Sequence, residues 1–119
     1  MRFLSMIRID EKTAKPPTER LMAEMGKLME EMTRKGVLID TAGLRPTREG
    51  VRVRLRSGKL STVDGPFTET KEVIGGYAIL NVASKQEALE QTQRFLEIHG
   101  EEWDIVCELR QIEEPDSGA

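Results

Sequence analysis

Apolar residues recur with two different spacings in the first third of the chain, and these spacings predict a strand followed by a helix. Residues 3–9 alternate between a more apolar and a less apolar face, as a β-strand does. After Pro16–Pro17, apolar residues recur at three- and four-residue intervals, as on one face of an α-helix. Thr18 is a suitable cap for the start of this helix, and Gly36 for its end. The predicted buried stripe is Leu21, Met22, Met25, Leu28, Met29 and Met32.

The middle of the chain has the alternation and the turn residues of a β-hairpin. Residues 51–55 and 60–63 alternate on either side of Ser57–Gly58, which predicts two antiparallel strands joined by a tight turn. A short strand at residues 37–39 precedes the hairpin, and residues 43–50 have the composition of a loop.

A strand, a helix and a last strand are predicted in the C-terminal part. Residues 77–82 are the most apolar strand, so we expect this strand to be central in the sheet. Ser84 and Glu87 fit a capping box, and Gly100 ends the helix that it starts. Residues 103–112 predict the last strand. The expected buried stripe of the second helix is Ala88, Leu89, Thr92, Phe95 and Leu96.

This order of elements predicts an α+β fold of the ferredoxin-like split βαβ type, with an inserted β-hairpin and both helices on one face of an antiparallel sheet. Leu4, Met6, Ala78 and Leu80 make both faces of their strands too apolar to be left in water. Sheet-to-sheet packing of two copies is the simplest cover. We interpret residues 1–112 as a single domain and residues 113–119 as a flexible acidic tail.

Composition and charge narrow the function classes. With 18 basic and 21 acidic residues the net charge is -3, which argues against nucleic acid as a partner. Cys107 is the only cysteine and His99 the only histidine, so the sequence predicts neither a disulfide nor a metal site. No apolar run approaches the roughly 20 residues of a membrane span, and no signal peptide is recognisable. These features predict a cytoplasmic protein without a membrane segment.

The segment after the hairpin carries the most specific motif. Asp64-Gly65-Pro66-Phe67 is followed by Glu69-Thr70-Lys71-Glu72 and by Gly75-Gly76-Tyr77. With the preceding hairpin, this stretch resembles the signature of the DGPF family, a branch of the YCII-related proteins, and the similarity extends over nearly the whole chain. The resemblance implies a dimeric α+β barrel, in which two ferredoxin-like domains pack sheet against sheet around a cleft.

The same resemblance implies two different roles. Related proteins carry a His and an Asp regarded as an active-site pair; Asp64 is the acid here, but the first-helix position of the His falls near Met25 and that helix contains no His. Family members are also encoded beside, or fused to, sigma factors of the extracytoplasmic-function type. This second association implies a regulatory or accessory role.

Asp64 is the candidate catalytic residue, because a carboxylate held by the rigid Gly65–Pro66 turn can accept or deliver a proton in a cleft. The alternative is a structural carboxylate that accepts backbone N–H groups of its own turn. Lys71, Tyr77 and Phe67 are the candidate ligand-binding residues. Their structural alternatives are a surface ion pair, a core tyrosine and a packing anchor, in that order.

Other polar residues have simpler interpretations. His99 follows the second helix, where it is best interpreted as a cap. Arg52, Arg54 and Arg56 share one face of the hairpin by alternation and are interpreted mainly as a solvated face.

Two functions therefore remain open. The first is a homodimer that binds a small molecule without a cofactor and has acid/base activity centred on Asp64. The second is a non-enzymatic accessory module that acts with an extracytoplasmic-function sigma factor. The first predicts a ligand-sized cleft, and the second a complementary surface for a protein partner.

Overall fold

The structure, a computed structural model, describes residues 1–101 and 103–114. It has the mixed α+β composition and the element order that the sequence predicts. The elements are β1 (Arg2–Ile9), α1 (Glu19–Arg34), β2 (Leu38–Gly43), the 3-10 turn η1 (Thr47–Glu49), β3 (Val51–Arg56), β4 (Lys59–Asp64), β5 (Val73–Asn81), α2 (Lys85–Glu97) and β6 (Val106–Gln111).

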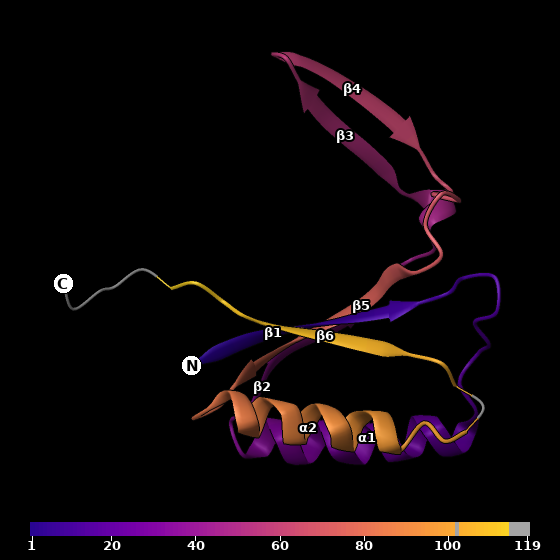
Figure 1. Cartoon of the computed structure of the whole chain (residues 1–119). Helices are drawn as coiled ribbons and strands as arrows, with labels where there is room; N and C mark the ends of the chain where they lie inside the picture. Colours follow the sequence, from indigo (N-terminus) through magenta and orange to yellow (C-terminus); the bar gives the residue numbers. More distant parts are fainter. Residues whose placement is uncertain (102, 115–119) are drawn as a thin grey trace.

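Four strands form an antiparallel sheet in the order β2-β5-β1-β6. The expected central position of β5 is confirmed, because β5 lies between β2 and β1. Both helices lie against one face of the sheet, and within residues 1–101 and 103–114 no helix covers the opposite face, called here the open face (Figure 1). Four side chains from the two inner strands form the apolar middle of the open face. Leu4 is opposite Ile79, and Met6 is opposite Tyr77.

The core lies between the sheet and the helices. Phe3 of β1 is paired with Leu80 of β5, and both side chains are buried. Leu28 and Met32 of α1 and Ala88 of α2 close over them. Burial on one face of β1 and β5 is what the alternation of these strands predicts. Within the described residues, no helix combines the length and apolar content that crossing a membrane requires.

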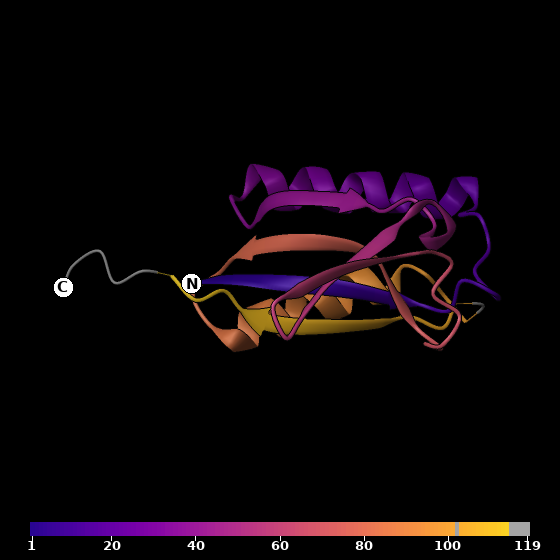
Figure 2. The same ribbon diagram turned by 90° about the horizontal axis from the view of Figure 1, so that it is seen from above.

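The hairpin of β3 and β4, residues 51–64, is called the arm. Its two strands pair only with each other, and the turn places Ser57 and Gly58 at φ of 51° and 78°, as a tight hairpin turn requires. The arm rises from the sheet on the side of the open face, and Figure 2 shows it from that side (Figures 1 and 2). Val53, Leu55 and Leu60 remain 65%, 70% and 74% exposed.

The predicted helix caps are confirmed. The Thr18 hydroxyl oxygen accepts the backbone N–H of Leu21 at 3.1 Å, and the Ser84 hydroxyl oxygen accepts that of Glu87 at 3.1 Å. The Glu87 carboxylate in turn accepts the N–H of Ala83 at 2.9 Å. His99 is buried, and its Nδ1 lies 2.8 Å from the Phe95 carbonyl oxygen near the end of α2, in agreement with a capping role.

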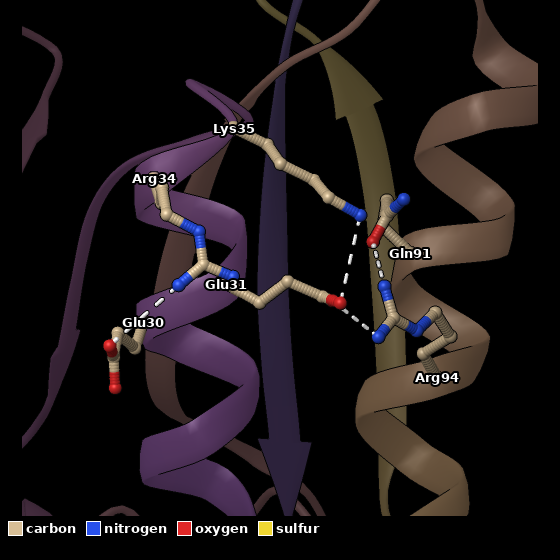
Figure 3. A network of polar contacts seen from close by, with 6 residues as sticks. All are labelled: Glu30, Glu31, Arg34, Lys35, Gln91 and Arg94. Carbon is tan, nitrogen blue, oxygen red and sulfur yellow. Dashed lines mark hydrogen bonds and ion pairs between the residues drawn. The ribbon is translucent and has the colours of Figure 1, made fainter.

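Polar contacts join the two helices across their solvent side (Figure 3). Glu31 of α1 accepts a hydrogen bond from Arg94 of α2 at 2.5 Å and lies 3.6 Å from Lys35. The Arg94 hydrogen bond is the main cause that lowers the pKa of Glu31. By contrast, the pair of Glu30 and Arg34 stays within α1. Glu31 is therefore the acidic residue that connects the two helices in this network.

Two details of the predicted buried stripes are wrong. Met22 is 60% and Leu89 is 41% exposed, although both were expected in the core. Their neighbours Leu21 and Ala88 are the buried residues, and a step of one residue turns a side chain by about 100° around the helix.

The strand limits also differ from expectation. β2 continues to Gly43 because its exposed residues still pair with β5 through backbone hydrogen bonds. The pattern of apolar residues does not predict such backbone pairing. β6 begins only at Val106, so Trp103 lies before the strand. Glu114, at the start of the predicted tail, forms an ion pair with Arg2 at 2.8 Å, whereas residues 115–119 lie outside the described residues.

Candidate functional site

The Asp64–Phe67 motif forms a turn that packs tightly against η1. The backbone N–H of Gly65 donates to the Gly50 carbonyl oxygen at 2.9 Å. A Cβ atom on Gly65 would meet the carbonyl oxygen of Thr47 at 1.6 Å. Only glycine allows this approach, so Gly65 brings the end of the arm against η1.

Phe67 anchors the next part of the turn. Its backbone N–H lies 3.4 Å from the Thr47 hydroxyl oxygen, and its ring is half-buried. The guanidinium of Arg52 stacks over this ring at 3.9 Å from the centroid and also pairs with Glu69. The packing alternative for Phe67 thus has direct support, and Phe67 also borders the cleft described below.

Glu11 connects a third segment to this turn. Its carboxylate accepts the backbone N–H of Thr47 at 2.8 Å and the Thr47 hydroxyl at 2.5 Å. Because Thr47 is the first residue of η1, the carboxylate satisfies an N–H group that a helical turn leaves without a partner. The side chains of Glu11 and Thr47 thus hold three segments together: the loop that follows β1, the turn η1, and the turn at Phe67.

A cleft of about 700 Å³ opens between these three segments. Ligand sites for small molecules commonly have volumes of this order. Its walls come from the end of β1 and the following loop, from η1 and from the segment between the arm and β5. The lining consists of Ile9, Asp10, Glu11, Lys12, Ala14, Pro46, Arg48, Pro66, Phe67, Thr68, Glu69, Thr70, Lys71 and Val73.

The structure brings two of the four predicted site residues together. Phe67 and Lys71 both line the cleft. Asp64 does not: it is exposed at the end of the arm, opposite Val51. The partial burial that a catalytic Asp64 predicts is therefore absent in the single chain.

Tyr77 lies at another place, on the open face. Its hydroxyl donates to Asp40 Oδ2 at 3.1 Å across the neighbouring strands β5 and β2. This hydrogen bond, and the negative charge of Asp40, raise the pKa of Tyr77. Tyr77 therefore adds a polar hydroxyl to the open face, and it is not among the residues that line the cleft.

Several charged residues of the cleft were not predicted as site residues, among them Glu11, Lys12 and Arg48. Glu11, Lys12 and Arg48 have no motif around them, and Glu11 meets Thr47 across 36 residues of sequence. A contact of that separation depends on how the loops fold back, which local patterns do not report. The only hint in the sequence is the basic charge around the hairpin, to which Arg48 belongs.

Cys107 and Met25 are two further residues, and little reactivity is expected of either. Cys107 is half-buried in β6, and burial raises the pKa of its thiol, with a smaller opposing effect from a hydrogen bond with Ser5. Met25, where relatives were expected to have a histidine, is partly buried on α1. Among residues 1–101 and 103–114, no three His, Cys, Asp or Glu side chains gather in a way that would hold a metal ion.

Sequence comparisons relate this chain to known proteins. The chain is similar to an uncharacterized protein of Rhizobium meliloti (strain 1021), with 34% identity over 77 residues. That similarity covers 65% of this chain and 62% of the length of the relative. A family model described as the YCII-related domain matches residues 1–98, from β1 through α2. The chain therefore belongs to the YCII-related domain family.

Proposed function

We propose that this chain is a small-molecule-binding homodimer with acid/base activity centred on Asp64. The observation that carries the binding role is the cleft of about 700 Å³ beside the Asp64–Phe67 turn, because it has the size of a ligand site and includes two of the predicted binding residues, Phe67 and Lys71. The same motif supports assignment to the DGPF branch of the family.

A ferredoxin-like split βαβ domain that dimerises into an α+β barrel is part of this proposal. It is supported by the strand order β2-β5-β1-β6 and by both helices lying on one face. The open face has an apolar middle, with the pairs Leu4–Ile79 and Met6–Tyr77. A second copy would remove this surface from water.

The role of Asp64 is linked to the dimer. Asp64 lies on the same face of the arm as Val51, Val53, Leu55 and Leu60, because cross-strand partners and alternate residues share a face. In a single chain its carboxylate is exposed to water, which does not favour general acid/base chemistry. We therefore propose that a second copy completes the environment of Asp64.

The first experiment is a thermal-melting screen of the purified chain against small carboxylates, amines, phosphates and cyclic metabolites. Asp64→Asn keeps the shape of the side chain and removes its charge. Asp104→Asn is the matched control, because Asp104 is also exposed and does not line the cleft. The proposal predicts a selective, dose-dependent rise in melting temperature that Asp64→Asn reduces and Asp104→Asn keeps.

Two results count against parts of the proposal. A ligand effect that is equal in wild type and Asp64→Asn keeps the binding role and removes Asp64 from it. A flat screen with a well-folded protein removes the binding role itself.

A second candidate is the accessory module that binds an extracytoplasmic-function sigma factor. The exposed apolar side of the arm favours it, because Leu55 and Leu60 are 70% and 74% exposed and such surfaces often mark protein contacts. This candidate predicts a flat ligand screen together with binding of a sigma factor that substitutions at Leu55 and Leu60 weaken. Isothermal titration of purified sigma factor into wild type and variants measures that effect.

A further inference from the structure

The charged residues that line the cleft divide into two groups that differ in their partners. Three are acidic, namely Asp10, Glu11 and Glu69, and three are basic, namely Lys12, Arg48 and Lys71. Their formal charges cancel. However, among the described residues the acidic side chains have polar partners and the basic side chains do not, and this difference determines which ligand the cleft favours.

Each acidic side chain already has at least one polar partner. Glu11 uses both carboxylate oxygens on Thr47. Asp10 accepts the backbone N–H of Lys12 at 2.9 Å, and Glu69 pairs with Arg52 beside the Phe67 ring. A cationic ligand would therefore meet carboxylates that already have partners, and at Glu11 it would compete with the contacts that join two segments of the cleft wall.

The basic side chains, by contrast, are not engaged in ion pairs with any described residue. Within the part of the chain that the structure describes, Lys12, Arg48 and Lys71 form no ion pair. The nearby Arg45 shows the contrast, because it pairs with Glu49 at 2.9 Å and does not line the cleft. The cleft thus presents donors from three separate segments that have no acceptor of their own.

The rest of the lining is mainly apolar. Ile9, Pro46, Pro66, Phe67 and Val73 provide this surface. Burial of an apolar ligand body against them supplies binding energy, and the charged donors supply selectivity for one kind of head group. Charge-assisted hydrogen bonds to carboxylate or phosphate oxygens are stronger than neutral ones.

We infer that the cleft binds a small organic anion, with its carboxylate or phosphate group held by Lys12, Arg48 and Lys71 and its apolar body against Phe67 and the neighbouring prolines. This inference rests on the proposed binding function and adds the ligand class. A carboxylate and a phosphate have in common the negatively charged oxygens that these donors recognise.

Calorimetric titration with charged and neutral probes of the same shape tests the ligand class. Benzoate, phenyl phosphate and neutral benzamide share an aromatic body, and acetate and inorganic phosphate lack it. We expect benzoate or phenyl phosphate to bind at least about tenfold more tightly than benzamide, and acetate and inorganic phosphate to bind more weakly than their aromatic counterparts. The comparison of benzoate with phenyl phosphate distinguishes the two head groups.

Variants then locate the binding site. Arg48→Gln with Lys71→Gln removes two of the three cations of the cleft and is expected to weaken anion binding by about tenfold or more. Arg54→Gln with Lys59→Gln is the matched control, because these exposed cations lie on the arm outside the lining. Each protein is first compared with wild type in its melting temperature without ligand, since the four side chains are exposed and their loss should leave the fold intact.

The outcomes separate this inference from the proposed function. Benzamide binding as tightly as benzoate, with no effect of Arg48→Gln and Lys71→Gln, overturns the anion class and keeps a binding cleft. Loss of anion binding in the arm variant alone places the anion on the arm and overturns the cleft assignment. A protein that binds no probe and no compound of the wider screen contradicts the proposed binding function as well.

Discussion

Gly65 lies so close to Thr47 that a Cβ atom built on the glycine would be 1.6 Å from the Thr47 carbonyl oxygen. This contact joins the end of the arm to η1, and Glu11 binds the same residue of η1 by accepting the backbone N–H and the hydroxyl of Thr47. The most specific part of the sequence motif is thus explained by packing. The glycine is required where the backbone of one segment reaches the backbone of another.

The first prediction follows from this contact. Gly65→Ala is expected to destabilise the protein by about 3 kcal/mol, because the added methyl group meets backbone atoms that cannot rotate away. Urea unfolding followed by circular dichroism measures the change. Gly26→Ala in α1 is the matched control: its Cβ finds open space, and alanine should stabilise the helix by about 1 kcal/mol. Equal stability of wild type and Gly65→Ala would contradict the packing role.

The parts of the fold that depend on neighbouring residues were predictable from the sequence. The alternation around Ser57–Gly58 gives the hairpin, and Thr18 and Ser84 mark both helix starts. Each of these signals involves only a few neighbouring residues, so it can be recognised directly in the sequence. The direction of the arm and the cleft depend on contacts between distant loops. The pair of Glu11 and Thr47 is an example, because neither residue belongs to a periodic pattern.

The same distinction explains the site. Phe67 and Lys71 were chosen for their place in the motif, and both line the cleft. Tyr77 belongs to the same motif, but the strand carries it to the open face, where its partner is Asp40. Nearness in sequence is therefore a poor guide to nearness in space once a strand begins.

A second prediction concerns Tyr77, the only tyrosine of the chain. The hydrogen bond to Asp40, and the charge of Asp40, raise the pKa of its hydroxyl, so tyrosinate should form at higher pH than in a model peptide. Asp40→Asn removes the charge and should lower the pKa towards its ordinary value. The near-ultraviolet absorbance of tyrosinate during a pH titration reports it. Asp104→Asn should leave the titration unchanged; an unchanged titration in Asp40→Asn would contradict the interaction.

A third prediction concerns Glu31 and the stability of the protein in acid. The hydrogen bond from Arg94 lowers the pKa of Glu31 in the folded state. A lowered folded pKa means that the carboxylate contributes stability above its unfolded pKa, and that this contribution is lost as the pH falls through the folded value. Urea midpoints measured from neutral to acidic pH should fall less steeply in Glu31→Gln than in wild type.

Glu30→Gln is the control for this experiment. Glu30 pairs with Arg34 inside α1 and makes no contact with α2 in the network of Figure 3. Its removal should leave the contact between Glu31 and Arg94 intact. Parallel pH profiles for wild type and Glu31→Gln would show that this contact does not contribute to the acid dependence.

A fourth prediction concerns Cys107. Burial raises the pKa of its thiol, which reduces the thiolate fraction that reacts with disulfide reagents. The folded protein should therefore react more slowly with a colorimetric disulfide reagent than the urea-unfolded chain does at the same pH. Because Cys107 is the only cysteine, one reaction curve reports this site alone. Equal rates in the folded and unfolded protein would contradict the effect of burial.

A fifth prediction tests how the arm takes part in the proposed dimer. Two-stranded hairpins are marginally stable alone, and the apolar side of the arm gains little from its own chain, since Leu55 and Leu60 are 70% and 74% exposed. If a second copy covers this side, Leu55→Gln with Leu60→Gln should raise the dimer dissociation constant at least about tenfold, because each leucine loses part of the roughly 1.5–3 kcal/mol of its burial. Sedimentation equilibrium measures this constant. Arg54→Gln with Arg56→Gln alters the opposite side of β3 and is the matched control. A dissociation constant that the leucine substitutions leave unchanged would show that the dimer forms without the arm, and a wild-type monomer would remove the dimer from the proposal.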